Sequence, residues 1–128
     1  MDANFAFDVD PRRDLVRITM SGFFQPADIV RYERARELAF ARLRCAPNRH
    51  LTLCDVSAMK IQTQDVVNEF ARLVADPRFV SRRMAFVTGS SLARLQTRRV
   101  AERDTIAYFS DLAAAEAWLF GESASQAA

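Results

Sequence analysis

The chain has 128 residues, 50% of them hydrophobic and 27% charged, which is the composition of one globular domain and excludes a disordered chain. A formal net charge of +2 lacks the basic excess of a dedicated nucleic-acid binder, and no apolar run approaches the ~20 residues that a membrane span needs. The two cysteines and the single histidine are not spaced as metal ligands are, so the sequence predicts neither a metal site nor a cofactor. The N-terminus lacks a signal-peptide pattern, so the expected compartment is the cytoplasm.

The first segment of the chain predicts an antiparallel hairpin. Apolar residues alternate with polar ones on both sides of a turn, with Phe5, Phe7 and Val9 before it and Val16, Ile18 and Met20 after it. The turn is predicted over residues 10–14, because Pro11 presets φ and the neighbouring Asp side chains can bond nearby amides. Arg17, Thr19 and Ser21 occupy the alternate positions, so one face of the hairpin is expected to be wetter.

A helix is predicted from Pro26 to about Leu43, followed by a buried strand. Pro26 suits the first turn of a helix, and Asp28 favours the positive end of its dipole. The apolar face carries Ile29, Tyr32, Ala39, Phe40 and Leu43, with Arg36 at its margin. The strand is predicted over His50–Val56, and His50 is expected at the surface where that strand begins.

The second half of the chain predicts two further strands, each between helices. After a loop over Ser57–Gln62, Thr63 is expected to cap a helix that ends at Asp76-Pro77. Met84–Val87 predicts a central parallel strand, and a helix capped by Ser90 or Ser91 runs from there to about Arg103. The last strand is predicted over Ile106–Phe109. The closing helix is expected to begin after Asp111, to stop at Gly121, and to bury Leu112, Ala115, Trp118 and Leu119.

This order predicts an α/β fold with a single-layer mixed, mainly parallel five-stranded sheet (β-β-α-β-α-β-α-β-α) flanked by four helices. Parallel neighbours joined through helices require right-handed crossovers, and the first hairpin supplies an antiparallel edge. Residues 1–121 are expected to form a single domain. Residues 122–128 are mostly small, and they predict a disordered tail.

Three segments resemble the STAS domain superfamily, and more closely its small stand-alone SpoIIAA-like group. Leu53–Ser57 is similar to the family's strand that ends in an Asp-x-Ser type sequence, and Arg83–Gly89 is similar to its apolar strand that runs into a helix. Tyr108–Asp111 through Glu116–Leu119 is similar to its closing aromatic strand and Glu-Ala-x-x-Trp-Leu style helix. The resemblance covers about Phe5 to Phe120.

The resemblance implies a non-enzymatic domain. In the anti-sigma-antagonist branch of the family, a partner kinase phosphorylates a serine at the start of the helix that follows the central strand. This sequence departs from that motif, because Lys60–Asp65 stands there with no serine or glycine. Thr63 is the only hydroxyl at the helix start and Ser57 lies earlier, so these two residues are weak candidates for phosphorylation.

A binding site is predicted at the carboxyl edge of the sheet, where open parallel sheets hold ligands. The loops that follow the parallel strands bring the candidate residues for a ligand or an anion, which are Asp55, Ser57, Thr88, Ser90, Ser91, Arg94 and Arg98. A helix N-terminus with two arginines nearby favours a phosphate or a carboxylate. The alternative is structural: a serine-capped helix with a solvated basic face, and an Asp55 that accepts bonds from loop amides.

The sequence leaves two main functions open. One is a regulatory or protein-interaction module that binds a protein partner or associates with itself, a homodimer included. The other is a small-molecule binder that holds a lipid, an apolar molecule or an anion at the carboxyl edge. Neither nucleic acid nor a membrane span is predicted as a partner. Catalysis is the least favoured reading, because His50 precedes its strand and so lies at the opposite edge from the candidate site.

Overall fold

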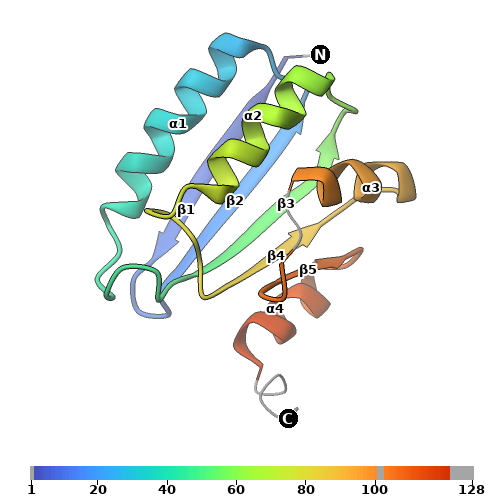
Figure 1. Cartoon of the computed structure of the whole chain (residues 1–128). Helices are drawn as coiled ribbons and strands as arrows, with labels where there is room; N and C mark the ends of the chain where they lie inside the picture. The colour runs from blue at the N-terminus through green and yellow to red at the C-terminus, as the bar shows by residue number, and fades with distance from the viewer. Residues whose placement is uncertain (1, 101–102, 122–128) are drawn as a thin grey trace.

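A computed structural model describes residues 2–100 and 103–121, which form one five-stranded sheet with helices on both faces (Figure 1). The predicted tail over residues 122–128 lies outside the described residues. In chain order the elements are β1 (Asn4–Asp10), β2 (Leu15–Gly22), α1 (Pro26–Phe40), β3 (Leu51–Met59), α2 (Gln64–Ala75), β4 (Arg83–Val87), α3 (Ser91–Val100), β5 (Ile106–Phe109) and α4 (Leu112–Phe120). The predicted order of strands and helices, and the mixed sheet, are confirmed.

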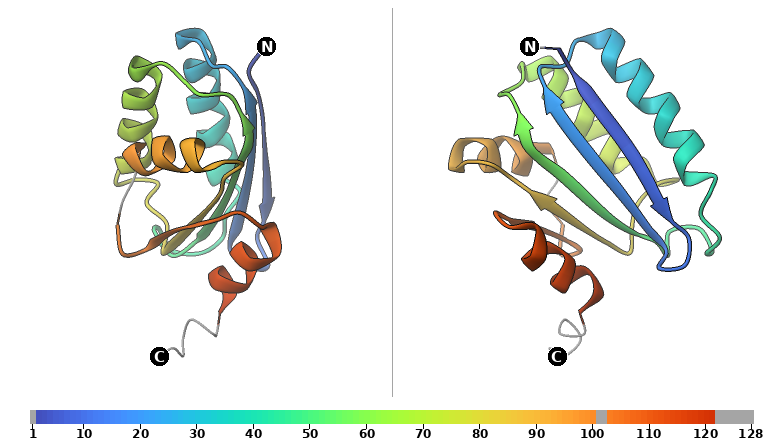
Figure 2. Two further views of the ribbon diagram at one scale, coloured as in Figure 1. Left: turned by 90° about the vertical axis from the view of Figure 1, so that its right-hand side faces the viewer. Right: turned by 180° about the vertical axis from the view of Figure 1, so that it is seen from behind.

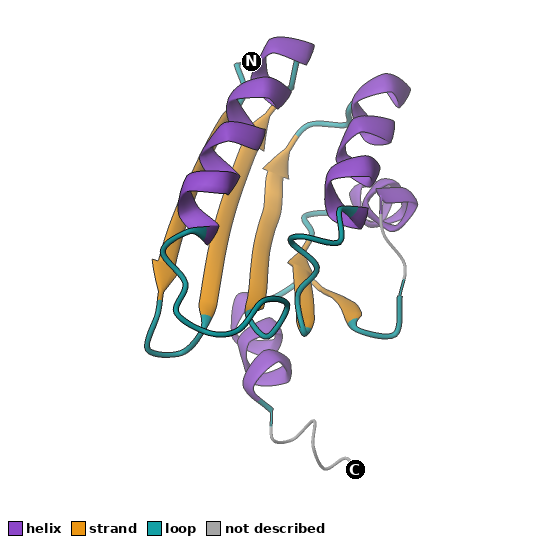
Figure 3. Cartoon of the chain, turned by 60° about the vertical axis from the view of Figure 1, so that its left-hand side comes forward, coloured by secondary structure: helices purple, strands orange, loops and turns teal. Residues whose placement is uncertain are grey.

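The strands follow one another across the sheet in the order β1-β2-β3-β4-β5. β1 and β2 pair antiparallel, and every later neighbour pairs parallel. Since each parallel crossover steps in the same direction and is right-handed, all three crossover helices must lie on the same face. Figures 2 and 3 show α1, α2 and α3 on that face, and α4 alone on the other.

The alternation of side chains along the strands divides the core in two. The face under α1 and α2 collects the larger cluster, whose strand members include Val16, Ile18, Cys54 and Phe86. Five aromatic rings from β1, α1, α2 and the segment after β2 meet there at centroid distances of 5.1–6.3 Å, namely Phe5, Phe7, Phe24, Tyr32 and Phe70. The other face buries the smaller cluster against Ala115 and Leu119 of α4.

Helix starts follow the predicted capping chemistry. Pro26 opens α1, where Asp28 accepts from the backbone N–H of Gln25 at 2.8 Å. The hydroxyl of Thr63 accepts from the backbone N–H of Val66 at 3.3 Å, and Asp111 caps α4 through the N–H of Ala113 at 3.0 Å. Each cap gives a partner to an N–H that has none within its own helix.

Three predictions of detail are wrong. β3 continues to Met59, so Ser57 lies within the strand and not in the loop after it, and Asp55 is further from the strand's end than predicted. The longer strand is possible because β2 pairs with β3 as far as Gly22 and Met59. Leu112 is 47% exposed, since α4 turns only Ala115 and Leu119 fully onto the sheet. His50 was expected at the surface, and it is 2% exposed.

His50 is buried because it belongs to a polar chain at the amino edge of the sheet. Its Nε2 lies 3.1 Å from the hydroxyl oxygen of Ser81, which lies 2.6 Å from that of Thr52. The ring of Phe40 packs edge-on against the imidazole at a centroid distance of 4.8 Å. Burial therefore lowers the pKa of His50 below its usual 6.5, and a hydrogen bond with the backbone of Phe79 opposes this shift.

Among the described residues, no helix combines the length and the apolar character that crossing a bilayer requires.

The buried imidazole predicts a pH dependence of stability. Because the unfolded chain takes up the His50 proton more readily than the folded chain, the free energy of unfolding is expected to hold above about pH 6.5 and to fall below it. Carboxylates titrate at lower pH, so they contribute little between pH values of about 7.5 and 5.5. Urea unfolding across this range measures how the free energy of unfolding changes with pH. His50→Gln should reduce this change, and an equal change in the two proteins would contradict the role given to His50.

Phe86 gives a test of the larger core cluster. This side chain is 4% exposed and stacks on Tyr108 at a centroid distance of 5.4 Å. We expect Phe86→Ala to lower the free energy of unfolding by about 3–5 kcal/mol, because it removes a buried ring and leaves a void. Leu38→Ala is the control, since Leu38 is 69% exposed and its loss should stay within about 0.5 kcal/mol. A Phe86→Ala protein that unfolds with wild-type stability would contradict this core.

Candidate functional site

The carboxyl edge of the sheet brings together the loops that the sequence singled out. Asp55 of β3 lies opposite Val87, the last residue of β4. The turn that follows β4 approaches β3 so closely that a Cβ on Gly89 would lie 2.5 Å from the carbonyl oxygen of Ser57. Glycine is therefore required there, because any other side chain would force the two segments apart. The structure thus places Ser57 beside the Thr88–Ser91 turn.

Asp55 and Ser57 are occupied with each other. The Asp55 Oδ1 accepts from the backbone N–H of Ser57 at 3.0 Å and lies 2.6 Å from its hydroxyl oxygen. This local hydrogen bonding is the structural role that an Asp near a strand end commonly has. Neither residue lines the hollow that the other candidates form.

The remaining five candidates line one hollow over the start of α3, and its walls include Thr88, Ser90, Ser91, Arg94 and Arg98. Ser90 caps α3 by accepting from the backbone N–H of Ala93 at 3.0 Å. The Nε of Arg94 reaches the Thr88 hydroxyl at a long 3.4 Å, and the guanidinium of Arg98 lies 5.2 Å from the ring centroid of Tyr108. The hollow is open to solvent, so it offers an anion positive charge with little desolvation.

Both phosphorylation candidates are exposed hydroxyls. Thr63 caps α2, so a phosphate on it would lie at the positive end of that helix. Ser57 bonds to Asp55, a carboxylate that would repel a phosphate. Phosphorylation of either residue stays a prediction.

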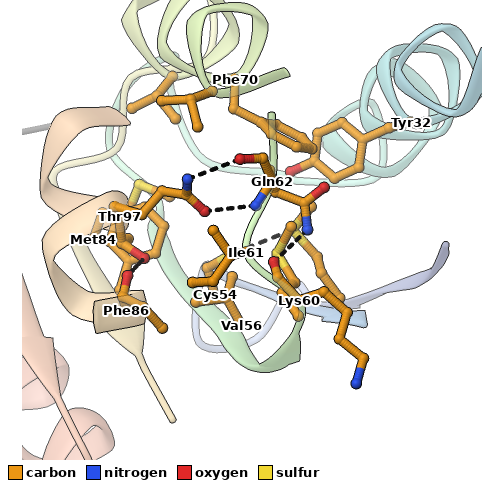
Figure 4. Close-up of a pocket in the computed structure, with 16 residues that line it drawn as sticks. Tyr32, Cys54, Val56, Lys60, Ile61, Gln62, Phe70, Met84, Phe86 and Thr97 are labelled. Atoms are coloured by element: carbon orange, nitrogen blue, oxygen red, sulfur yellow. Dashed lines mark hydrogen bonds between the residues drawn. The ribbon is translucent and has the colours of Figure 1, made fainter. Parts of the chain in front are cut away.

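A more enclosed and more apolar space lies under α2 and α3, and we call it the central cavity (Figure 4). Its volume is about 70 Å³. It lies between the carboxyl halves of β3 and β4 and the helices that cover them. Its apolar lining includes Met20, Cys54, Val56, Met59, Val67, Phe70, Val74, Met84, Phe86 and Ala93. α3 packs chiefly against α2, so the inner side of α3 forms a wall of the cavity.

Gln62 and Gln96 hold the polar side of the central cavity together. The side-chain oxygen of Gln96 accepts from the backbone N–H of Gln62 at 2.8 Å, and its amide donates to the backbone oxygen of Gln62 at 3.0 Å (Figure 4). The Gln62 side chain, which is buried, accepts from the N–H of Phe24 at 2.8 Å and donates to the carbonyl of Gly22 at 3.0 Å. These bonds join α3, the β3–α2 loop and the segment before α1, so the lining is held from three sides.

The Tyr32 hydroxyl faces the central cavity. Tyr32 is 6% exposed, and no described residue forms a hydrogen bond with its hydroxyl. Burial raises the pKa of this phenol, so it stays protonated and can donate. Burial also raises the pKa of the Cys54 thiol in the same lining to about 12, which keeps it from acting as a thiolate nucleophile. The cavity can therefore hold an apolar molecule and offer it one hydroxyl.

Sequence reasoning did not find the central cavity. Its lining comes from the same apolar stripes that predict the core, and periodicity does not distinguish a lining residue from a packed one. Two polar residues stand out near the cavity: Gln62 is buried in a loop, and Gln96 is half-buried on a helix. Their hydrogen bonding follows from tertiary packing, so the sequence does not show it. Within residues 2–100 and 103–121, no three His, Cys, Asp or Glu side chains gather in a cluster suited to a metal ion.

These features define an open α/β domain with three helices on one face and a cavity beneath them. No protein-family model matches this sequence, and no curated protein matches it. A solved structure is similar over 93% of this chain and 96% of its own, with a TM-score of 0.71 and 16% identity. It is an uncharacterized protein from the DUF3478 family with a SpoIIAA-like fold, from Shewanella loihica PV-4. The chain therefore has a SpoIIAA-like fold, as the resemblance predicted.

The open hollow yields a stability prediction. Arg98 is exposed and Arg94 is half-buried, so we expect Arg94→Ala with Arg98→Ala to cost less than about 1 kcal/mol. Urea unfolding of the double variant measures this. A loss of several kcal/mol would show that the two arginines support the fold and are not available to a ligand.

Proposed function

We propose that this protein is a non-enzymatic binding domain that holds a small apolar molecule in the central cavity. The observation that carries the proposal is a partly enclosed apolar space lined by the buried Tyr32, whose hydroxyl forms no hydrogen bond with the described residues. Ligand sites are commonly apolar concavities with a few placed polar groups. The proposal corresponds to the small-molecule alternative that the sequence left open, with the site beneath the helices instead of at the open hollow.

The lining suits ligands of variable shape. Met20, Met59 and Met84 bring three flexible thioethers to a space that Phe70 and Phe86 otherwise bound with rigid rings. Methionine side chains can turn aside when a larger molecule enters. Since the cavity volume is about 70 Å³, the resting cavity suits a small molecule, and a longer one requires these side chains to move.

A binding role fits the reactive groups better than a catalytic role does. His50 is buried at the opposite edge of the sheet, and Cys54 is held as a neutral thiol. Asp55 and Asp111, two carboxylates at the carboxyl edge of the sheet, each accept a hydrogen bond from a backbone N–H two residues further along the chain. A cytoplasmic location remains a prediction from the sequence.

The second candidate is the regulatory or protein-interaction module, and the outer side of α3 favours it. Leu92 is 61% exposed and Leu95 is 58% exposed on this helix. Ala93, Gln96 and Thr97 of the same helix line the central cavity. A molecule in the cavity would thus contact the helix that presents the two leucines, so the two candidate functions are compatible.

Binding can be tested with 1-hexanol as a neutral apolar probe. We expect its titration to move the ¹³C-methyl NMR signals of Met20, Met59 and Met84, because all three line the central cavity. Ala93→Phe should abolish these shifts, since its ring would fill the space under α3. Ala114→Phe is the matched control, because it places the same ring on the exposed side of α4 and should leave binding unchanged.

A titration that leaves the three methionine signals in place would contradict the proposal. The same holds if Ala93→Phe and Ala114→Phe bind the alcohol equally, because the probe would then occupy another part of the protein.

A further inference from the structure

Arg36 is a charged side chain inside the core. It lies in the middle of the buried face of α1 and is 5% exposed. Its Nη1 donates to the backbone oxygen of Leu73 at 2.6 Å, and its guanidinium carbon lies 4.1 Å from the ring centroid of Phe79. A buried arginine normally requires a carboxylate and hydrogen bonds for all its N–H groups.

The nearest carboxylate compensates this charge poorly. Asp76 Oδ2 lies 3.8 Å from Nη2 of Arg36, which is beyond hydrogen-bonding distance, while Arg78 reaches the same oxygen at 2.8 Å. Hydrogen bonds from Arg78 are the main cause that lowers the pKa of Asp76 to about 2. Both Nε and Nη2 of Arg36 are buried, and neither has a hydrogen-bond partner among the described residues. Leaving such donors unsatisfied costs more than an ordinary lost hydrogen bond, because the group is charged.

A second cavity, which we call the Arg36 cavity, adjoins these donors. It has a volume of about 30 Å³, and Thr52, Ser81 and Arg103 also line it. The Nε of Arg103 is likewise buried, and no residue within 2–100 and 103–121 accepts a hydrogen bond from it. Among the described side chains around this space, the unsatisfied groups are therefore all donors on two cations. A space with that lining is complementary to an anion.

The Arg36 cavity and the central cavity have a common wall. Both are lined by Tyr32, Phe70, Val74 and Met84, which come from α1, α2 and β4. One space is apolar, and the other presents positive charge. Met84 is the flexible member of this wall. A molecule that occupied both spaces would need an apolar body and an acidic head.

We propose that the molecule bound by this protein is a small amphiphilic acid, whose carboxylate pairs with Arg36 and Arg103 while its apolar part occupies the central cavity. This inference rests on the proposed function and deepens it by naming the class of ligand. The carboxylate supplies the acceptor oxygens that Nε and Nη2 of Arg36 lack. The combined volume of the two cavities is below the ~150 Å³ of a cavity known to admit benzene. A short acid is therefore the ligand to test, and it enters only when Met84 and its neighbours in the common wall turn aside.

The test compares sodium hexanoate with 1-hexanol, which share a chain length and differ in the head group. Dissociation constants come from the methionine methyl titrations of the wild-type protein. We expect hexanoate to bind at least about tenfold more tightly than the alcohol. The reason is that a charge-assisted ion pair in a desolvated site contributes more binding free energy than a neutral hydrogen bond does. This comparison needs no variant, so it decides the proposal even where a substitution impairs folding.

Variants then test whether Arg36 causes the preference for hexanoate over 1-hexanol. Arg36→Met should bind both probes alike and unfold at the same or a higher temperature than the empty wild type, because replacing a poorly paired buried charge by an apolar side chain is often stabilising. Arg103→Met should reduce the preference for the acid. Arg34→Met, on the exposed side of the same helix, is the control and should keep it.

The outcomes separate the two proposals. Equal binding of acid and alcohol by the wild type would overturn the acidic-head proposal and leave the apolar cavity standing, with water as the partner of Arg36. A preference that persists in Arg36→Met would overturn it as well. Failure of both probes to bind the wild type would overturn the cavity function together with the inference.

Discussion

The handedness of the parallel crossovers is the constraint on which the rest of this structure depends. Because the sheet grows in one direction from β2 to β5, right-handed connections place α1, α2 and α3 on one face. Three helices then cover the same face, and α3 packs chiefly against α2. Its inner side and the carboxyl halves of β3 and β4 leave the central cavity between them. The cavity is thus a consequence of the topology.

The same arrangement explains why a positive charge can lie inside the core. α1 and α2 pack beside one another over the sheet, and the middle of α1 therefore faces α2 and the loop that follows it. Arg36 occupies this position, where the Leu73 carbonyl and the Phe79 ring give it partial compensation. A fully apolar residue would pack there at lower cost, so the retained charge is the feature that most needs a functional explanation.

Much of the fold followed from local patterns, and the exceptions have identifiable causes. Alternation located β1 and β2, and Pro26, Thr63 and Asp111 placed helix starts within a residue. The end of β3 was missed because residues past Val56 are held in the strand by pairing with β2, which is a long-range interaction. The burial of His50 was missed because Ser81, its partner, is 31 residues away in the chain.

The sequence by itself determined the order of elements, the caps and the resemblance to a SpoIIAA-like domain, since spacing and capping act over a few residues. It also marked Thr88–Ser91 as a turn at the carboxyl edge. Only the tertiary structure decided that Arg36, marginal on its own helix, would be enclosed beside Thr52, Ser81 and Arg103. The physical reason is that a side chain's burial depends on which elements pack over it, and periodicity along one helix carries no information about the others.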